Sequence, residues 1–387
     1  MYAAKRPSKR PVIFILIVAA WLLAACGSRL SNANWPGLSA EGNIVYVAFG
    51  NGVLAYDVET QSNQWVFSPQ PGRLSFYAAP SVEDGRVVVG DYGVSQGMFS
   101  PGVVVSAYGL SAGSGSTPDE LWAANQIAAD RIVAPPLQVG DRVFVGTADN
   151  QVVALDATDG RELWRKETGH SIWGQPSYKE GVLFVTSMDK KVYAFDAENG
   201  DLVWDQPTEL GGAIASKALV DTDLIYVTAF DGKLHAISQA TGEIKWSAEG
   251  QDWVWGAPVM EDGVVYFVDA AGNIYAVDGV SGKQLWTQTV EGTVQTAPAI
   301  ADGVLYIASD KQSESDAAIV TGLLTAMSTD GGTVLWQQQT AVPIYTAPVI
   351  VGEDVVVAVQ TTDDLLNAFD RSTGTKKWDV ALPDTSQ

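Results

Sequence analysis

The stretch VVALDATDGRELW (152–164) decides the fold of this chain, because it returns along the sequence at intervals of roughly 40 to 50 residues. Close copies read VYAFDAENGDLVW (192–204), IYAVDGVSGKQLW (274–286) and LNAFDRSTGTKKW (366–378). Looser copies read VLAYDVETQSNQW (53–65), LHAISQATGEIKW (234–246) and LTAMSTDGGTVLW (324–336), and an eighth, VSAYGLSAGSGSTPDELW (105–122), carries a Gly/Ser-rich insertion. A repeat of this period predicts an array of similar supersecondary units.

Each copy ends in a tryptophan that follows an alanine, and in seven of the eight copies the separation is ten residues. The tryptophans are Trp65, Trp122, Trp164, Trp204, Trp246, Trp286, Trp336 and Trp378, and the alanines are Ala55, Ala107, Ala154, Ala194, Ala236, Ala276, Ala326 and Ala368. Six copies have a glycine four residues before the tryptophan, whereas the first has Gln61 there. This spacing predicts that every tryptophan ring packs against the neighbouring unit, where glycine lets the backbone approach.

Short apolar runs such as 181–187 and 263–269 precede the copies, and Asp-Asn, Asp-Gly and Gly-Asn pairs separate them. Such pairs supply the positive φ angles of tight hairpins, so each unit is expected to be a four-stranded antiparallel meander. Sheets with two apolar faces have to stack, and a closed radial arrangement leaves only short strand edges. The sequence predicts an all-β chain that forms an eight-bladed β-propeller over residues 35–380.

In its fullest form, Ala-x-Asp-x-x-Thr-Gly-x-x-x-Trp, the repeat resembles the tryptophan-docking repeat of quinoprotein propellers, and the likeness covers about residues 35–380. One function that this resemblance implies is that of a dehydrogenase that depends on pyrroloquinoline quinone (PQQ). The alcohol dehydrogenases of that family stack the quinone on a disulfide between adjacent cysteines. Cys26 is the only cysteine here and no Cys-x-x-Cys-His haem sequence occurs, so we expect no PQQ and no enzyme activity.

The N-terminal region has the pattern of a secretory signal. Four basic residues precede an apolar run over 11–25, which is shorter than the roughly 20 residues of a membrane-spanning helix. The run ends in Leu-Ala-Ala-Cys (23–26), which resembles the lipobox of bacterial lipoproteins. We therefore expect a signal peptide (1–25), a lipidated cysteine, Cys26, on a tether (26–34), and a short C-terminal tail (381–387). The net charge of −22 disfavours nucleic acid as a partner.

One set of aligned positions indicates a binding site. The segments that lead into the innermost strand of each blade carry, at one repeat position, Trp35, Tyr77, Val133, Trp173, Ala215, Trp255, Gln295 and Tyr345. By propeller geometry these residues surround a mouth of the central channel, with Lys217 two residues further on in the fifth repeat. Two interpretations stay open: the aromatic residues plug the channel by packing, or they form a platform for a partner. Insertions at 91–102, with Met98 and Phe99 at the tip, and at 309–322 would lie on the same side.

Catalytic and metal-binding signals are weak. His235 alternates with apolar neighbours and is expected to be a packed residue, while His170 lies between the third and fourth blades. Acidic turns such as 148–150 and 363–364 lack the dense oxygen-ligand spacing of a calcium loop, so we expect them to serve turn geometry and expect no metal site.

A lipoprotein of this length with eight such repeats is similar to the BamB family, whose propeller is a scaffold in the outer-membrane β-barrel assembly machinery. That resemblance implies a monomeric, non-catalytic protein-binding subunit, anchored by lipid to the periplasmic face of the outer membrane. In a host with a single membrane, the protein would lie on the outer face of the cytoplasmic membrane. The alternatives are an extracytoplasmic ligand-binding or sensory propeller and the quinone enzyme.

Overall fold

The computed structural model describes residues 36–69, 74–95, 103–113, 115–313, 319–359, 361 and 364–383. These all belong to the second of two contact units, Trp35–Gln387, and the first unit is Met1–Asn34. The expected signal peptide and tether, with Cys26, lie outside the described residues, as do Trp35, Met98 and Phe99.

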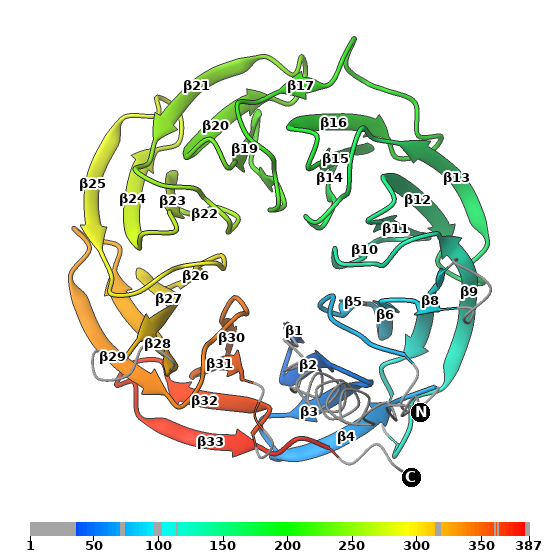
Figure 1. Cartoon of the computed structure of the whole chain (residues 1–387), viewed down its shortest axis with the longest axis horizontal. Helices are drawn as coiled ribbons and strands as arrows, with labels where there is room; N and C mark the ends of the chain where they lie inside the picture. Colours follow the sequence, from blue (N-terminus) through cyan, green and yellow to red (C-terminus); the bar gives the residue numbers. More distant parts are fainter. Residues whose placement is uncertain are drawn as a thin grey trace, which may run out of the picture. The chain divides into compact units, whose positions relative to one another are not determined.

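Eight antiparallel sheets follow one another around a ring, and in seven of them the strand order follows the sequence from the inside outwards (Figure 1). In blade 2 the four main strands also follow in order, and an additional short strand, β7 (Val94–Ser95), pairs with β8 (Val103–Ser111). The first four blades consist of β1 (Gly37–Glu41), β2 (Ile44–Phe49), β3 (Gly52–Asp57) and β4 (Ser62–Phe67); β5 (Ser81–Glu83), β6 (Arg86–Gly90), β7 (Val94–Ser95), β8 (Val103–Ser111) and β9 (Glu120–Ala128); β10 (Leu137–Val139), β11 (Arg142–Gly146), β12 (Gln151–Asp156) and β13 (Glu162–Glu167); and β14 (Ser177–Lys179), β15 (Val182–Thr186), β16 (Lys191–Asp196) and β17 (Thr208–Glu209).

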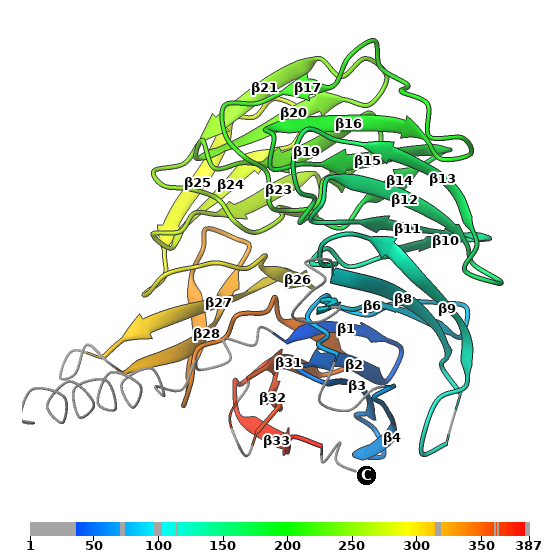
Figure 2. The same cartoon turned by 45° about the vertical axis from the view of Figure 1, so that its right-hand side comes forward.

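The last four blades consist of β18 (Leu219–Val220), β19 (Leu224–Thr228), β20 (Lys233–Ser238) and β21 (Ile244–Glu249); β22 (Val259–Glu261), β23 (Val264–Val268), β24 (Asn273–Asp278) and β25 (Gln284–Thr289); β26 (Ala299–Ala301), β27 (Val304–Gln312), β28 (Val320–Ser328) and β29 (Val334–Thr340); and β30 (Val349–Val351), β31 (Asp354–Ala358), β32 (Leu366–Asp370) and β33 (Lys376–Val380). Figure 2 shows the strands of blades 3, 4 and 5 lying one blade over the next. The expected eight-bladed propeller of four-stranded antiparallel blades is confirmed, and the described part of the chain contains no helix.

The repeat alanine and tryptophan face each other across the third and fourth strands. Ala154 is paired with Trp164, and a β-bulge follows directly at Ala154/Leu155. The same pairing recurs in blades 1, 5, 6, 7 and 8. Because alanine has a small side chain, the indole ring can lie flat over it.

Two blades depart from the sequence prediction. In blade 2 the residue opposite Trp122 is Gly109 and not Ala107, because β8 and β9 are longer and pair in a shifted register. A Cβ atom on Gly109 would lie 2.3 Å from the indole, so only glycine fits there. In blade 4 the fourth strand is short and begins after Trp204; Pro207, which has no N–H to donate, lies just before it.

The tryptophans join neighbouring blades, as the spacing predicts. In six blades the indole N–H donates to a backbone carbonyl of the next blade, over 2.8 to 3.1 Å. The ring lies against the repeat glycine of that blade; a Cβ atom on Gly282, for example, would be 2.6 Å from the ring of Trp246. For Trp122 and Trp164 this hydrogen bond satisfies a donor that would otherwise be buried without a partner.

The connections that lead from one blade into the next share a face with the loops between second and third strands. In blades 3 to 6 a loop aspartate accepts a backbone N–H from the connection into its own blade, and these pairs are Asp149 with Ala129, Asp189 with Gly169, Asp231 with Gly211 and Asp269 with Gln251. The acidic turns in this part of the chain therefore stabilise connections. We call this side of the ring the connection face.

Candidate functional site

A cavity of about 530 Å³ runs along the axis of the ring (the central channel). Its wall consists of the segments that enter the innermost strand of each blade. All seven described members of the aligned set line it: Tyr77, Val133, Trp173, Ala215, Trp255, Gln295 and Tyr345. The repeat register thus brings residues that are far apart in sequence into one cavity.

The aromatic members alternate around the ring. Tyr77 leads into blade 2, Trp173 into blade 4, Trp255 into blade 6 and Tyr345 into blade 8. Blades 3, 5 and 7 contribute the smaller or polar Val133, Ala215 and Gln295 at the same position. Trp173 is 36% exposed and Tyr345 is 38% exposed, so both rings present a face to solvent. The described aromatic residues therefore leave open space in the central channel.

On blade 5 and blade 6, an aromatic cluster connects the central channel with the connection face. Phe230, in the loop after β19, lies 4.5 Å from Trp255 and 6.1 Å from Trp253 between ring centroids. Trp253 is 58% exposed, which is more than any other aromatic residue in the described part of the chain. An exposed indole that packs on a neighbouring ring, as Trp253 does on Phe230, is a common anchor for a protein partner.

A second cluster lies on the other side of the ring. Tyr77 packs edge-on against Tyr92 at 4.7 Å, and the Arg131 guanidinium lies 4.5 Å from the centroid of the Tyr92 ring. Arg131 also donates a hydrogen bond to the Tyr92 hydroxyl over 2.7 Å. A cation held over an aromatic face in this way adds a positively charged group to the connection face.

The long hairpin of blade 7 also reaches the connection face. Strands β27 and β28 each have nine residues, and the backbone of Asp310 pairs with Thr293 in the connection between blades 6 and 7 (Figure 2). Asp310 also accepts the N–H of Ile344, next to Tyr345. The beginning of the insertion predicted at 309–322 therefore lies beside Tyr345, while residues 314–318 are outside the described residues.

Two carboxyl groups on this face are shielded from water. Burial raises the pKa of Asp91 to about 6, although N–H donors at Gly93 and Ser106 oppose the shift. Burial also raises the pKa of Asp310 to about 6, although the hydrogen bond from the N–H of Ile344 opposes this shift. In both cases removal from water disfavours the charged form more than the hydrogen bonds favour it.

Lys217 lies in the wall of the central channel on blade 5, and among the described residues it is the only charged one that lines the cavity. Its backbone is held from blade 4, because Thr186 donates to the carbonyl of Ser216 over 2.6 Å and Ser177 donates to the carbonyl of Ala218 over 2.6 Å. The side chain is open to the channel, yet protein surrounds it on most sides. This burial lowers the pKa of the Lys217 ammonium group.

The histidines do not meet in a catalytic arrangement. His235 is 5% exposed and lies between the Ser247 hydroxyl and the Asp231 carboxylate, and burial lowers its pKa. His170 is exposed, and its ring Nδ1 accepts the N–H of Ser171. Within the described ranges no group of three metal-ligating side chains comes together, and no helix there is long and apolar enough to span a membrane.

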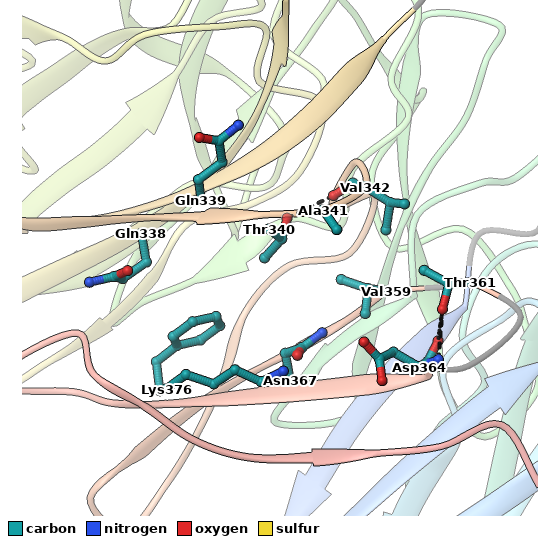
Figure 3. Close-up of a pocket in the computed structure, with 11 residues that line it drawn as sticks. Gln338, Gln339, Thr340, Ala341, Val342, Val359, Thr361, Asp364, Asn367 and Lys376 are labelled. Atoms are coloured by element: carbon teal, nitrogen blue, oxygen red, sulfur yellow. Dashed lines mark hydrogen bonds between the residues drawn. The ribbon is translucent and has the colours of Figure 1, made fainter.

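A smaller cavity of about 170 Å³ lies between blades 7 and 8 (Figure 3). Gln338 of β29 lies on the side of Asn367 and Lys376, whereas the side chain of Gln339 points away from them. It is separate from the aligned set and polar throughout much of its wall. Its wall also contains Phe369 and Lys376, together with the acidic Asp364, but no residue of the aligned set.

The sequence-based reasoning missed Phe230, Trp253, Tyr92 and Arg131. A repeat signal for them exists: Tyr92 and Phe230 occupy equivalent positions after the second strand, since each donates its N–H to the connection beside it. Arg131 and Trp253 also share a position, as their carbonyls accept the equivalent bonds. Aligning the loops as well as the strands would have found all four.

Comparison with known proteins gives two kinds of relatives. A stretch of 205 residues is 25% identical to the outer membrane protein assembly factor BamB of Moranella endobia, covering 52% of this chain and 49% of that protein. A stretch of 76 residues is 34% identical to the quinohemoprotein alcohol dehydrogenase ADH IIB of Pseudomonas putida, covering 17% of this chain and 11% of that enzyme. These matches span less than half the length of either relative.

The fold is shared with a solved structure, BamB from Moraxella catarrhalis, at a TM-score of 0.60 and 19% identity, over 80% of this chain and 86% of that one. The family model described as outer membrane protein assembly factor BamB matches residues 105–250, 206–287, 231–323 and 316–387. Together these ranges run from residue 105 to residue 387, well over half of the chain. On this match and on its eight tryptophan-docked blades, the chain belongs to the BamB family.

Proposed function

We propose that this chain is a non-catalytic, protein-binding propeller that assists the assembly of outer-membrane β-barrel proteins. The observation that carries the proposal is the exposed aromatic surface at the connection face, formed by Trp173, Trp253 and Tyr345. Aromatic side chains at a concave mouth provide large contact area at a low cost in conformational entropy. The BamB relatives support the class of partner, a component of the barrel-assembly machinery.

A quinone enzyme has less support. The dehydrogenase relative shares a short repeat stretch with this chain, and one scaffold hosts many functions. Calcium prefers a shell of carboxylate and carbonyl oxygens, whereas the residues that line the central channel include no Asp or Glu. The residues present do not fit a calcium-dependent quinone site, and the proposal involves neither PQQ nor calcium.

The proposal also covers location. Leu23, Ala24 and Ala25 before Cys26 support cleavage and lipidation at the cysteine, which would hold a monomeric propeller at the periplasmic face of the outer membrane. Several acyl chains on one residue give stable anchoring, since each buried methylene contributes about 0.8 kcal/mol. Mass spectrometry of the mature N-terminus tests this part, and retention of residues 1–25 would contradict it.

The partner-binding role can be tested with the double variant Trp173→Ala and Trp255→Ala. Loss of two contact rings should reduce capture of barrel-assembly proteins from gently solubilised membranes by about tenfold or more, since a central aromatic anchor contributes at least about 2 kcal/mol. Leu285→Ala is a suitable control, because Leu285 is equally apolar and 49% exposed but lies on the outer strand β25.

The same experiment separates binding from packing. Thermal unfolding of the double variant should stay within a few degrees of the parent protein. If unfolding drops sharply while the folded fraction captures its partners normally, the rings only pack within the channel. Capture of no assembly component by the parent protein would also overturn the proposed function.

A further inference from the structure

Among the described residues that line the central channel there is one charged side chain, in a protein whose net charge is −22. At the repeat position of Lys217, the other blades contribute Gly37, Ala79, Pro135, Gln175, Ala257, Ala297 and Ala347. Six of these seven residues are small. The lysine is therefore a local departure from the repeat and not a requirement of the fold.

The wall directly beside Lys217 is also unusual. Ala215 occupies the position that carries Trp173 on blade 4 and Trp255 on blade 6. Residues two apart in an extended segment point the same way, so the small Ala215 leaves space next to the lysine side chain. The result is a recess that has an indole on the blade at either side and an ammonium group in its wall.

Lys217 has no ion pair and no hydrogen bond among the described residues. Burial alone lowers its pKa, since no neighbouring carboxylate opposes the effect. The lysine side chain is exposed to the channel, and an anion that enters the recess would form a charge-assisted hydrogen bond with its ammonium group. The hydrogen bonds from Thr186 and Ser177 fix the backbone on either side of the lysine, so the recess is preformed.

The geometry points to a binding site in the central channel for a carboxylate on a flat, apolar body, with the carboxylate on Lys217 and the body against Trp173 and Trp255. The cavity of about 530 Å³ lies within the range of small-molecule sites. Indole faces favour flat partners, and a charge-assisted hydrogen bond fixes their orientation. The site shares Trp173 and Trp255 with the proposed protein-binding surface, so it is tested at Lys217 and Ala215, which the partner-capture experiment leaves unchanged.

The test uses 2-naphthoate as the probe and its uncharged analogue 2-naphthamide as the control ligand, with the full mature chain and calorimetric titration. We expect saturable binding of 2-naphthoate. The affinity for 2-naphthamide should be weaker by about tenfold or more, because the amide cannot form a charge-assisted hydrogen bond with the lysine. Equal affinities, or no saturable binding of the acid at millimolar concentration, would overturn the site.

Variants locate the probe. Lys217→Met should weaken binding of 2-naphthoate by about tenfold or more, while Lys217→Arg, which keeps the charge, should retain most of it. Lys283→Met removes an exposed lysine on blade 6 outside the channel and should leave binding unchanged. If Lys217→Met and Lys283→Met behave alike, the probe binds elsewhere.

A second variant leaves the lysine intact. Ala215→Tyr adds an aromatic ring where four other described blades carry Trp or Tyr, so the repeat geometry accommodates it. It should fill the recess and abolish binding of 2-naphthoate without lowering the unfolding temperature. Undiminished binding to folded Ala215→Tyr would contradict a ligand beside Lys217.

Discussion

At the scale of single residues, Asp91 and Asp310 have the most unusual environments on the connection face. Both carboxyl groups have a pKa raised to about 6 by burial. In the unfolded chain each would titrate near 3.8. Between these values the folded protein holds more protons than the unfolded chain, so each group lowers the free energy of unfolding as the pH rises from about 4 to 6.

This predicts a pH-dependent effect of Asp91→Asn. The amide oxygen can still accept the N–H groups of Gly93 and Ser106, while the amide nitrogen can donate to the Tyr108 hydroxyl. Relative to the parent, the variant should become more stable by about 2 kcal/mol between pH 4 and pH 7, since each unit of pKa shift corresponds to about 1.4 kcal/mol. Urea unfolding across this range checks it, and parallel stability curves would refute it.

At the scale of blades, the tryptophans are not equivalent. Trp65 is 1% exposed, and its indole N–H has no hydrogen-bond partner among the described residues. The repeat turn is interrupted in blade 2 by the Gly/Ser-rich insertion, so no carbonyl occupies the usual place. Trp164, by contrast, donates to the carbonyl of Ala197 over 3.1 Å.

This difference predicts unequal effects of the same substitution. Trp164→Phe leaves the Ala197 carbonyl without its donor, whereas Trp65→Phe removes a donor that has no acceptor. Both lose similar ring volume, so Trp164→Phe should lower the free energy of unfolding by about 1 kcal/mol more than Trp65→Phe. Equilibrium denaturation of the two variants measures the difference, and equal losses would show that the hydrogen bond does not contribute.

At the scale of the whole propeller, ring closure takes place between blade 8 and blade 1. Every described strand of blade 1 comes from residues 37–67 and every strand of blade 8 from 349–380, so no sheet combines the two ends of the ring. Closure depends on side-chain packing, with the Trp378 ring 5.3 Å from Tyr56. Because Gln61 replaces the repeat glycine, the Trp378 indole donates to Asp354 of its own blade over 2.7 Å.

Asp354→Ala should therefore weaken this seam. Asp354 is 6% exposed and also pairs with Lys377, so its loss leaves a buried indole N–H without a partner, at a cost of about 1–3 kcal/mol. Hydrogen exchange should speed up mainly in blades 8 and 1. Glu353→Ala removes an exposed surface ion pair with Arg371 and should cost less than about 0.5 kcal/mol. Uniform acceleration around the ring would argue against a weak seam.

Much of the site could be predicted because the register repeats. Once Trp173 and Trp255 are aligned, propeller closure places them in one channel wall, and the structure does so. The residues that were missed, such as Phe230 and Arg131, lie in loops whose lengths vary between blades. The distance between two such loops depends on the packing of neighbouring blades, and the spacing of residues along the sequence does not determine that packing.

The sequence by itself determined the number of blades, their strand order and the positions of the docking tryptophans, because a fixed period and a fixed Ala-to-Trp spacing are local properties of each repeat. Only the tertiary structure decided the register in blade 2, where Gly109 and not Ala107 lies under Trp122, and the isolation of Lys217 in an otherwise uncharged channel wall. Those features depend on contacts between strands and blades far apart along the chain, and they exist only once the ring has closed.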